Sequence, residues 1–396
     1  MMLRRGLQKL ARRGASHCNV RGISSTTPAN GRGQVYAWGK AKSGSLGLGP
    51  EVTETVGTPA RVTVLADEDV VSVRAFADTS GALTAKGDLF LWGNNDGGKI
   101  SADQESAKFY PFKVDGLEDV NIVDFGVGSK HGMVLDDKGR VYTWGWGGSF
   151  FAGAGALGHG NKADCTEPTL LQMFVDEGVK ITQIACGGRH AVALDDEGMV
   201  WTWGQGEYGR LGHGGSSDIT EPEPLEFFEE EGACSLVRSG SSYCATLTKD
   251  GKVFTWGKNN DGQLGIGNPL SMGFAMETFP REVTEGLPKD DPVVDIATGA
   301  THTLLRTAAG KALTAGMKIF NIPAALNFDD DIKIASIAAG KVSERFRRLL
   351  LRSLPVSIAG TNFIFPHITP HRTFQRRQHR KDTHTRGAKA DCKGTT

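Results

Sequence analysis

The chain has 396 residues, in which 45 Lys and Arg balance 45 Asp and Glu. The balance hides three unequal parts, because residues 1–50 carry a net charge of +9, residues 51–340 carry −19 and residues 341–396 carry +10. An apolar content of 39% argues against wholesale disorder, no uncharged run approaches the ~20 residues of a membrane span, and six cysteines without metal-ligand spacing argue against a disulfide scaffold or a zinc site.

Residues 1–32 form an acid-free, arginine-rich segment. Leu3, Leu7 and Leu10 recur at helical spacing, basic side chains fill the other faces, and a Ser- and Thr-rich stretch follows. This pattern is typical of a mitochondrial transit peptide, which is disordered and removable. We therefore expect a protein of the mitochondrial matrix or of the matrix face of the inner membrane. A nuclear or cytoplasmic protein with a basic arm is the alternative.

An internal repeat follows, in which the dipeptide Trp-Gly recurs at steps of 52 to 59 residues. A Gly stands five residues before each Trp, and a sixth Gly, Gly310, stands five residues before Ala315, where the Trp is lost. A His stands eight residues before three of these glycines. Four units continue with the motif L-G-x-G. The repeated residues are Trp38, Trp92, Trp144, Trp203 and Trp256, with His131, His190 and His302.

Short β-branched and aromatic runs flank each of these glycines, which predicts hairpins in which the Gly adopts a positive φ. Each unit then holds about four short antiparallel strands. One such sheet cannot bury both of its faces, whereas radial stacking of several sheets can, so the sequence predicts an all-β fold, a β-propeller. The tryptophans are expected to pack between adjacent blades. The histidines are interpreted as structural, because a catalytic His has no reason to recur in several blades.

These motifs resemble the regulator-of-chromosome-condensation (RCC-type) repeat family, whose blades carry A-C-G-x-x-H, x-x-G-x-V-x-x-W-G and L-G-x-G. The resemblance covers residues 33–340 and implies a propeller that usually closes with seven four-stranded blades, of which about five and a half are present here. Members act as nucleotide-exchange factors for small GTPases, as chromatin-binding proteins or as scaffolds. With its transit peptide, the chain looks most like the mitochondrial branch, which is linked to mitochondrial ribosome assembly and to exchange on an inner-membrane fusion GTPase.

The sequence contains no phosphate-loop motif, no HExxH and no nucleophile elbow. Paired acids at 136–137 and 195–196 fall in the expected hairpin turns and are interpreted as solvated turn residues. We therefore expect no catalytic residue, cofactor or metal. The predicted function is that of a non-catalytic protein-interaction scaffold in mitochondria, with a guanine-nucleotide exchange factor as the alternative.

The third unit departs from the repeat, since thirteen residues rather than eight separate Trp144 from Leu157. The insert contains Trp146, Phe150 and Phe151. Aromatic side chains on exposed loops often anchor protein interfaces. These three residues are therefore partner-binding candidates, and packing on the adjoining blade is the alternative.

An acidic stretch lies at 221–231, and a second acidic cluster lies at 329–331. Such stretches steer basic partners or simply form a solvated edge. The binding candidates in the first stretch are Glu226, Glu229, Glu230 and Glu231. Because residues 51–340 carry −19, we expect a basic protein or a GTPase as partner, no direct DNA binding, and RNA only through a complex.

Residues 341–396 contain no repeat motif, and their composition switches from acidic to basic. We interpret this segment as a non-repeat tail that is either disordered or a gene-model artefact. The domain boundaries predicted from the sequence are therefore 1–32, 33–340 and 341–396.

Overall fold

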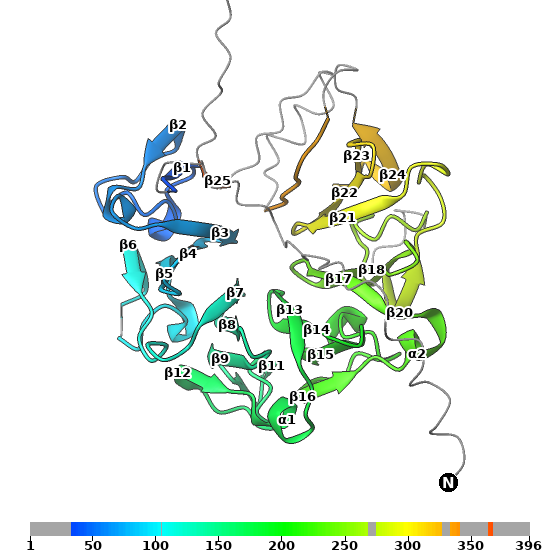
Figure 1. Ribbon diagram of the computed structural model, residues 1–396, viewed down its shortest axis with the longest axis horizontal. Coiled ribbons are helices and arrows are strands. Elements are labelled where there is room, and N and C mark those ends of the chain that lie inside the picture. The colour runs from blue at the N-terminus through cyan, green and yellow to red at the C-terminus, as the bar shows by residue number, and fades with distance from the viewer. Residues whose placement is uncertain (1–32, 104, 268–274, 327–332, 341–362, 367–396) are drawn as a thin grey trace, which may run out of the picture.

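A computed structural model describes residues 33–103, 105–267, 275–326 and 333–340, and the backbone of 363–366. Five four-stranded antiparallel sheets stand around a common axis like the blades of a propeller (Figure 1). The predicted β-propeller is thereby confirmed. The expected transit peptide, the acidic cluster at 329–331 and the basic tail outside 363–366 lie outside the described residues.

Each blade is an antiparallel meander whose first strand lies nearest the axis and whose fourth lies at the rim (Figure 1). Blade 1 contains β3 (Val70–Phe76), β4 (Thr79–Thr84), β5 (Leu89–Asn94) and β6 (Ala107–Lys113). Blade 2 contains β7 (Ile122–Val127), β8 (His131–Asp136), β9 (Val141–Gly145) and β12 (Cys165–Leu170). Blade 3 contains β13 (Ile181–Cys186), β14 (His190–Asp195), β15 (Val200–Gly204) and β16 (Ile219–Pro224). Blade 4 contains β17 (Cys234–Ser239), β18 (Tyr243–Thr248), β19 (Val253–Lys258) and β20 (Met276–Glu282). Blade 5 contains β21 (Val293–Thr298), β22 (His302–Thr307), β23 (Ala312–Gly316) and β24 (Phe320–Leu326).

A partial blade precedes blade 1. It consists of β1 (Val35–Gly39) and β2 (Val56–Arg61), with β25 (Phe363–Pro366) antiparallel to β1 on its other side. Four residues of the tail thus take the place of a second strand in this blade. The remaining short elements are the 3-10 helices η1 (Lys42–Gly44), η2 (Thr63–Leu65), η3 (Asp96–Gly98) and η4 (Glu207–Gly209), the helices α1 (Gln172–Asp176) and α2 (Phe227–Glu231), and the strands β10 (Gly148–Ser149) and β11 (Gly153–Ala154).

The hairpins between second and third strands have the predicted glycines at positive φ, between +81° and +97° in the five blades. The paired acids in two of these turns are not both solvated, and that interpretation was wrong for the first of each pair. Asp195 is buried, its Oδ1 accepts from the N–H groups of Glu197, Gly198 and Met199, and its Oδ2 accepts from the indole of Trp201. Asp136 is likewise buried, and it accepts from the backbone N–H groups two and four residues later. These carboxylates satisfy turn donors that would otherwise be unpaired.

The Trp of one blade packs against the connection between the third and fourth strands of the preceding blade, where the L-G-x-G motif recurs. The indole N–H of Trp203 donates to the carbonyl oxygen of Ala156 at 2.9 Å, and that of Trp92 donates to Ser45 O at 3.1 Å, in each case just before the L-G-x-G motif. Trp144 makes the equivalent bond to Lys99 O at 2.8 Å, in a loop that lacks the motif. A Cβ on Gly158 would stand 2.9 Å from the Trp203 Nε1, at a φ of +82°. Glycine is therefore required at this position both by its backbone conformation and by the close approach of the indole.

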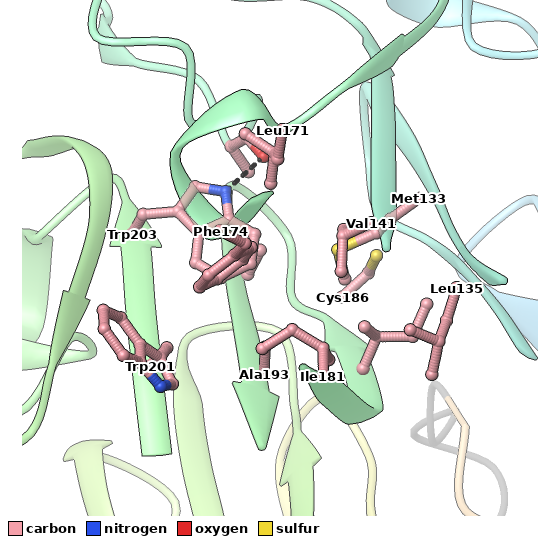
Figure 2. Close-up of a cluster of buried hydrophobic side chains, with 13 residues drawn as sticks. Met133, Leu135, Val141, Leu171, Phe174, Ile181, Cys186, Ala193, Trp201 and Trp203 are labelled. Atoms are coloured by element: carbon pink, nitrogen blue, oxygen red, sulfur yellow. Dashed lines mark hydrogen bonds between the residues drawn. The ribbon is translucent and has the colours of Figure 1, made fainter. Parts of the chain in front are cut away.

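The hydrophobic core is divided into layers between neighbouring blades. Figure 2 shows the layer between blades 2 and 3, where Met133, Leu135 and Val141 face Ile181, Cys186 and Ala193. Phe174 of α1 closes this layer, with its ring 5.4 Å from that of Trp201 and 6.1 Å from that of Trp203, both edge to face. Adjacent blades thus bury each other's faces, as radial stacking requires.

The repeated histidines are buried at the turns near the axis. Burial lowers the pKa of His131 to about 3 and that of His302 to about 4, so both rings are neutral at pH 7. His190 Nε2 lies 2.9 Å from Ser239 Oγ and 3.2 Å from the Sγ of Cys244, both in the next blade. At the corresponding position of blade 4, Tyr243 Oη donates to the backbone carbonyl of His302 at 2.5 Å.

Residues 333–340 continue the repeat on the far side of blade 5. The N–H of Ile334 donates to Gly310 O at 2.8 Å, just as Ile181 donates to Gly139 O at 3.0 Å where blade 3 begins. Residues 337–339 line an axial cavity of about 210 Å³ together with the first strands of the five blades. The segment therefore follows the path of a first strand, although it pairs with no second strand among the described residues.

Candidate functional site

The meander order assigns every connection to one of two faces of the ring. Connections from first to second strands and from third to fourth strands lie on one side, which we call the insert face because it carries the 146–155 insert. Connections from second to third strands, and from each blade to the next, lie on the opposite face. This division decides which candidate residues can belong to one site.

The insert folds as a small hairpin, in which β10 pairs antiparallel with β11. Asp218 of the next blade fastens its base, because its Oδ2 accepts from Ala154 N at 2.7 Å and its Oδ1 accepts from Gly206 N at 3.0 Å. A charge-assisted bond from a carboxylate to a backbone N–H is stronger than a neutral one. The hairpin is thus a fixed protrusion on blade 2 that leans on blade 3.

Phe150 and Phe151 occupy the tip of this hairpin. Their side chains are 90% and 96% exposed, and their rings contact each other edge to face with centroids 5.3 Å apart. They do not pack on the adjoining blade, which was the alternative reading. Their role as partner contacts stays a prediction.

Trp146 is half-buried at the base of the insert. The Nζ of Lys130 lies 5.0 Å from the ring centroid of Trp146, and the Cζ of Arg189 lies 5.5 Å from it. The indole is therefore flanked by two cations. Sequence reasoning grouped it with the phenylalanines, whereas the structure gives it a different environment beside them.

The glutamate candidates lie on the opposite face. Glu229, Glu230 and Glu231 belong to α2, and Glu226 precedes this helix, in the connection from blade 3 to blade 4. Glu231 pairs with Lys252 at 3.2 Å, and the buried Phe228 of the same helix packs on Phe254 and Trp256. The structure therefore does not bring the aromatic and acidic candidates together.

Sequence reasoning also missed how the negative charge is distributed. The five connections that lead into blades 1 to 5 hold fifteen Asp and Glu and only two Lys, in residues 62–69, 114–121, 171–180, 225–233 and 283–292. The second-to-third-strand hairpins of the same face add five acidic and six basic residues, whereas all the connections of the insert face together hold ten acidic and eight basic residues. The acidity of the body is thus concentrated on the opposite face. In each repeat, Asp and Glu gather in the connection that leads into the first strand, and this recurrence is the sequence signal that could have shown the distribution.

No reactive centre emerges from the part of the chain that the structure describes. No three His, Cys, Asp or Glu side chains gather there as metal ligands, and no helix there is long and apolar enough to cross a membrane. Cys186 and Cys244 are free and buried, and burial raises the pKa of both thiols. Buried neutral thiols are poor nucleophiles.

Comparison with known proteins places these features in a family. The regulator of chromosome condensation (RCC1) repeat matches residues 32–83, 86–135, 138–194, 197–247 and 250–305. The human E3 ubiquitin-protein ligase HERC2 is 35% identical over 72% of this chain, but the chain spans only 6% of that protein. Two Arabidopsis thaliana proteins are each 30% identical: the ultraviolet-B receptor UVR8, over 72% of this chain and 60% of the receptor, and the mitochondrial RCC1 domain-containing protein RUG3, over 78% of this chain and 73% of that protein.

Solved structures show the same fold. Prp20p from Saccharomyces cerevisiae, whose structure was described with its binding to Gsp1p and histones, has a TM-score of 0.68 at 24% identity and 79% coverage of both chains. Human WBSCR16 has a TM-score of 0.65 at 25% identity, covering 77% of this chain and 79% of that one. Each of the five repeat matches spans the outer two strands of one blade and the inner two strands of the next, so the sequence repeat is offset from the blades by half a blade. The chain therefore belongs to the regulator of chromosome condensation repeat family.

Proposed function

We propose that this protein is a non-catalytic protein-interaction propeller that works as a scaffold in mitochondria, in the assembly of mitochondrial ribosomes. The observation that carries the interaction role is the β10–β11 hairpin, which holds two almost fully exposed phenylalanine rings on a fixed base. Apolar rings that are exposed to water contribute little to the stability of the free protein, and they gain free energy when a partner buries them. The likeness to Prp20p, a protein that binds other proteins, supports the same role.

The mitochondrial address rests on two further observations. The acid-free, arginine-rich residues 1–32 have the pattern of a transit peptide. The 30% identical Arabidopsis thaliana relative RUG3 is itself mitochondrial. The acidic connections of the opposite face favour a basic protein as a second contact of the same scaffold.

Proximity labelling in intact cells tests the proposal, with the full chain compared to the Phe150→Ser/Phe151→Ser variant. Removing two exposed rings should leave the free energy of unfolding within about 0.5 kcal/mol, and the labelled set should lose specific mitochondrial proteins. Phe279→Ser is the matched control, because this 56% exposed ring lies on the outer strand of blade 4. An identical labelled set for all three proteins would refute the hairpin as the contact, and a set without mitochondrial proteins would refute the address.

Nucleotide exchange on a small or mitochondrial GTPase is the second candidate. The same hairpin favours it, because a fixed protrusion with an apolar tip can deform a nucleotide pocket without covalent chemistry. Release of a labelled guanine nucleotide from purified mitochondrial GTPases, measured with and without the protein, separates the two functions. Acceleration that disappears in the double Ser variant supports exchange, and unchanged release supports the scaffold.

A further inference from the structure

A band of cationic and aromatic side chains runs across the insert face beside the hairpin. It begins with Lys130, Trp146 and Arg189, which are stacked as described above. It continues through Tyr208, whose ring lies 5.6 Å from the Cζ of Arg210 and 4.9 Å from the Nζ of Lys258. We call this set the cationic band, comprising Lys130, Trp146, Arg189, Tyr208, Arg210 and Lys258.

The cationic band and the hairpin are joined by direct contacts. The N–H of Gln205 donates to Arg189 O at 2.9 Å, and Gln205 Oε1 accepts from Arg210 at 3.2 Å. Gln205 Nε2 also reaches Ala152 O of the insert at 3.4 Å. A ligand that covers Phe150 and Phe151 therefore has the cationic band within reach.

The charges of the cationic band are largely unneutralised. Arg210 pairs with the exposed Glu207 at 3.2 Å. No Asp or Glu among the described residues forms an ion pair with Lys130, Arg189 or Lys258. Such an arrangement is unusual in a body with a net charge of −19, where carboxylates are abundant.

Some of these cations also lie close enough to a neighbouring cation to influence its pKa. Burial lowers the pKa of the neighbouring Lys99 to about 8, while the charge of Asp96 opposes that shift and the charge of Lys130 adds to it. Burial lowers the pKa of Arg210 too; the charge of Glu207 opposes that shift, and the charge of Arg189 makes a lesser contribution in the same direction as burial. An anion that binds between two cations held close together by the fold reduces the electrostatic repulsion between them.

The geometry points to an acidic segment of a partner protein as the ligand of the insert face. The carboxylates of the partner would contact Lys130 and Arg189, and its apolar side chains would pack on Phe150 and Phe151. Arginine binds carboxylates through two parallel hydrogen bonds, and the exposed rings supply the buried area. This inference rests on the proposed interaction function and assigns the chemistry of its partner. It adds an acidic contact on the insert face to the basic partner expected on the opposite face.

A protein segment fits this surface better than a nucleic acid does. A polyanion is repelled at long range by a body with a charge of −19, and the cationic band offers few of the many phosphate contacts that duplex or single-strand binding needs. A short segment with two or three carboxylates approaches within a Debye length of the cationic band, where the local positive charge dominates.

A random peptide library displayed on phage, selected against the full chain, tests the inference. Enriched peptides should carry surplus Asp and Glu next to Leu, Phe or Trp, and the synthetic peptides should bind less tightly as salt rises. Lys130→Gln, Arg189→Gln and the double variant should weaken binding, the double by about tenfold or more. Lys162→Gln is the control, because this exposed lysine lies in the β9–β12 connection that carries the hairpin but does not belong to the cationic band. Circular dichroism of each single variant verifies folding.

The outcomes separate the inference from the function on which it rests. Loss of peptide binding in both the Phe150→Ser/Phe151→Ser and the charge variants supports the two together. Loss in the Ser variant alone, or enrichment of neutral or basic peptides, overturns the acidic ligand and leaves the hairpin as a contact. Enrichment of no peptide overturns the inference. Tight binding of a 20-nucleotide RNA that depends on Lys130 and Arg189 assigns the cationic band to nucleic acid and also overturns it.

Discussion

The close contact between Gly158 and the indole of Trp203 gives the sharpest prediction about stability. In a Gly158→Ala variant the new Cβ sits at a φ of +82° and 2.9 Å from the indole nitrogen, with Leu171 Cδ2 at 3.1 Å on its other side. The left-handed conformation costs about 1–2 kcal/mol for a residue with a Cβ, and overpacking a buried contact costs about 1–3 kcal/mol more. We therefore expect a loss of about 2–5 kcal/mol in the free energy of unfolding.

The chain offers a matched control for this substitution. Gly265 occupies the same motif position one blade from the end and has a φ of +70°, but the Trp of the next blade is replaced there by Ala315. Its Cβ would meet the Ala315 Cβ at 3.2 Å and the Pro323 Cδ at 3.3 Å, both longer than the 2.9 Å approach at Gly158 and within reach of a small shift. Gly265→Ala should therefore cost mainly the backbone strain, about 1–2 kcal/mol.

Equilibrium unfolding in urea, followed by far-ultraviolet circular dichroism, measures both costs, provided that the m-value stays constant. In a Trp203→Ala background the added cost of Gly158→Ala should fall to that of the backbone strain, because the two positions are in contact. Equal losses for Gly158→Ala and Gly265→Ala, or an undiminished loss in the Trp203→Ala background, would refute the idea that the motif exists to receive the next Trp.

Three further predictions concern the buried polar groups. Burial lowers the pKa of His131 to about 3, whereas its pKa in the unfolded chain is about 6.5, so between these values only the unfolded chain binds the proton and the free energy of unfolding rises with pH. Acidification from pH 7 to pH 5 should therefore lower the free energy of unfolding by about 2 kcal/mol through this residue. His131→Asn should flatten that part of the pH profile of stability. Asp195→Ala removes the acceptor of three backbone N–H groups and one indole, so it should destabilise by about 2–4 kcal/mol and shift the fluorescence of Trp201, whereas no shift would contradict that bond. Tyr243→Phe should cost about 1–2 kcal/mol in urea unfolding, because the carbonyl of His302 and the hydroxyl of Thr303 both lose a buried partner, and a neutral result would show that water replaces it.

The blade architecture was predictable because each blade repeats the residues that build it. The Trp-Gly steps placed the third strands, and the glycine five residues earlier placed each hairpin, since few other residues tolerate that backbone. The spacing from Trp144 to Leu157 likewise predicted an extra loop at the position where β10 and β11 stand. In these cases one local pattern dictates one local geometry.

The arrangement of the candidate site was less accessible from the sequence. Phe150 and Glu230 lie on opposite faces because a meander alternates its connections, and a linear inspection of acidic and aromatic runs ignores that alternation. Trp146 differs from its neighbours because Lys130 and Arg189 come from two different blades, although both stand just before a repeated His. Asp195 was mistaken for a solvated turn residue, since a sequence does not show where the N–H groups of a turn point.

The central claim is that the insert face receives a protein partner. Site-specific photo-crosslinking in intact cells tests it most directly, with the crosslinking amino acid placed at position 151 on the hairpin and, as the control, at Val64, which is 49% exposed on the opposite face. We expect position 151 to yield a discrete crosslinked protein that disappears when Lys130 and Arg189 are both changed to Gln. No crosslink at 151 alongside a discrete one at 64 would contradict the claim and move the partner to the acidic face.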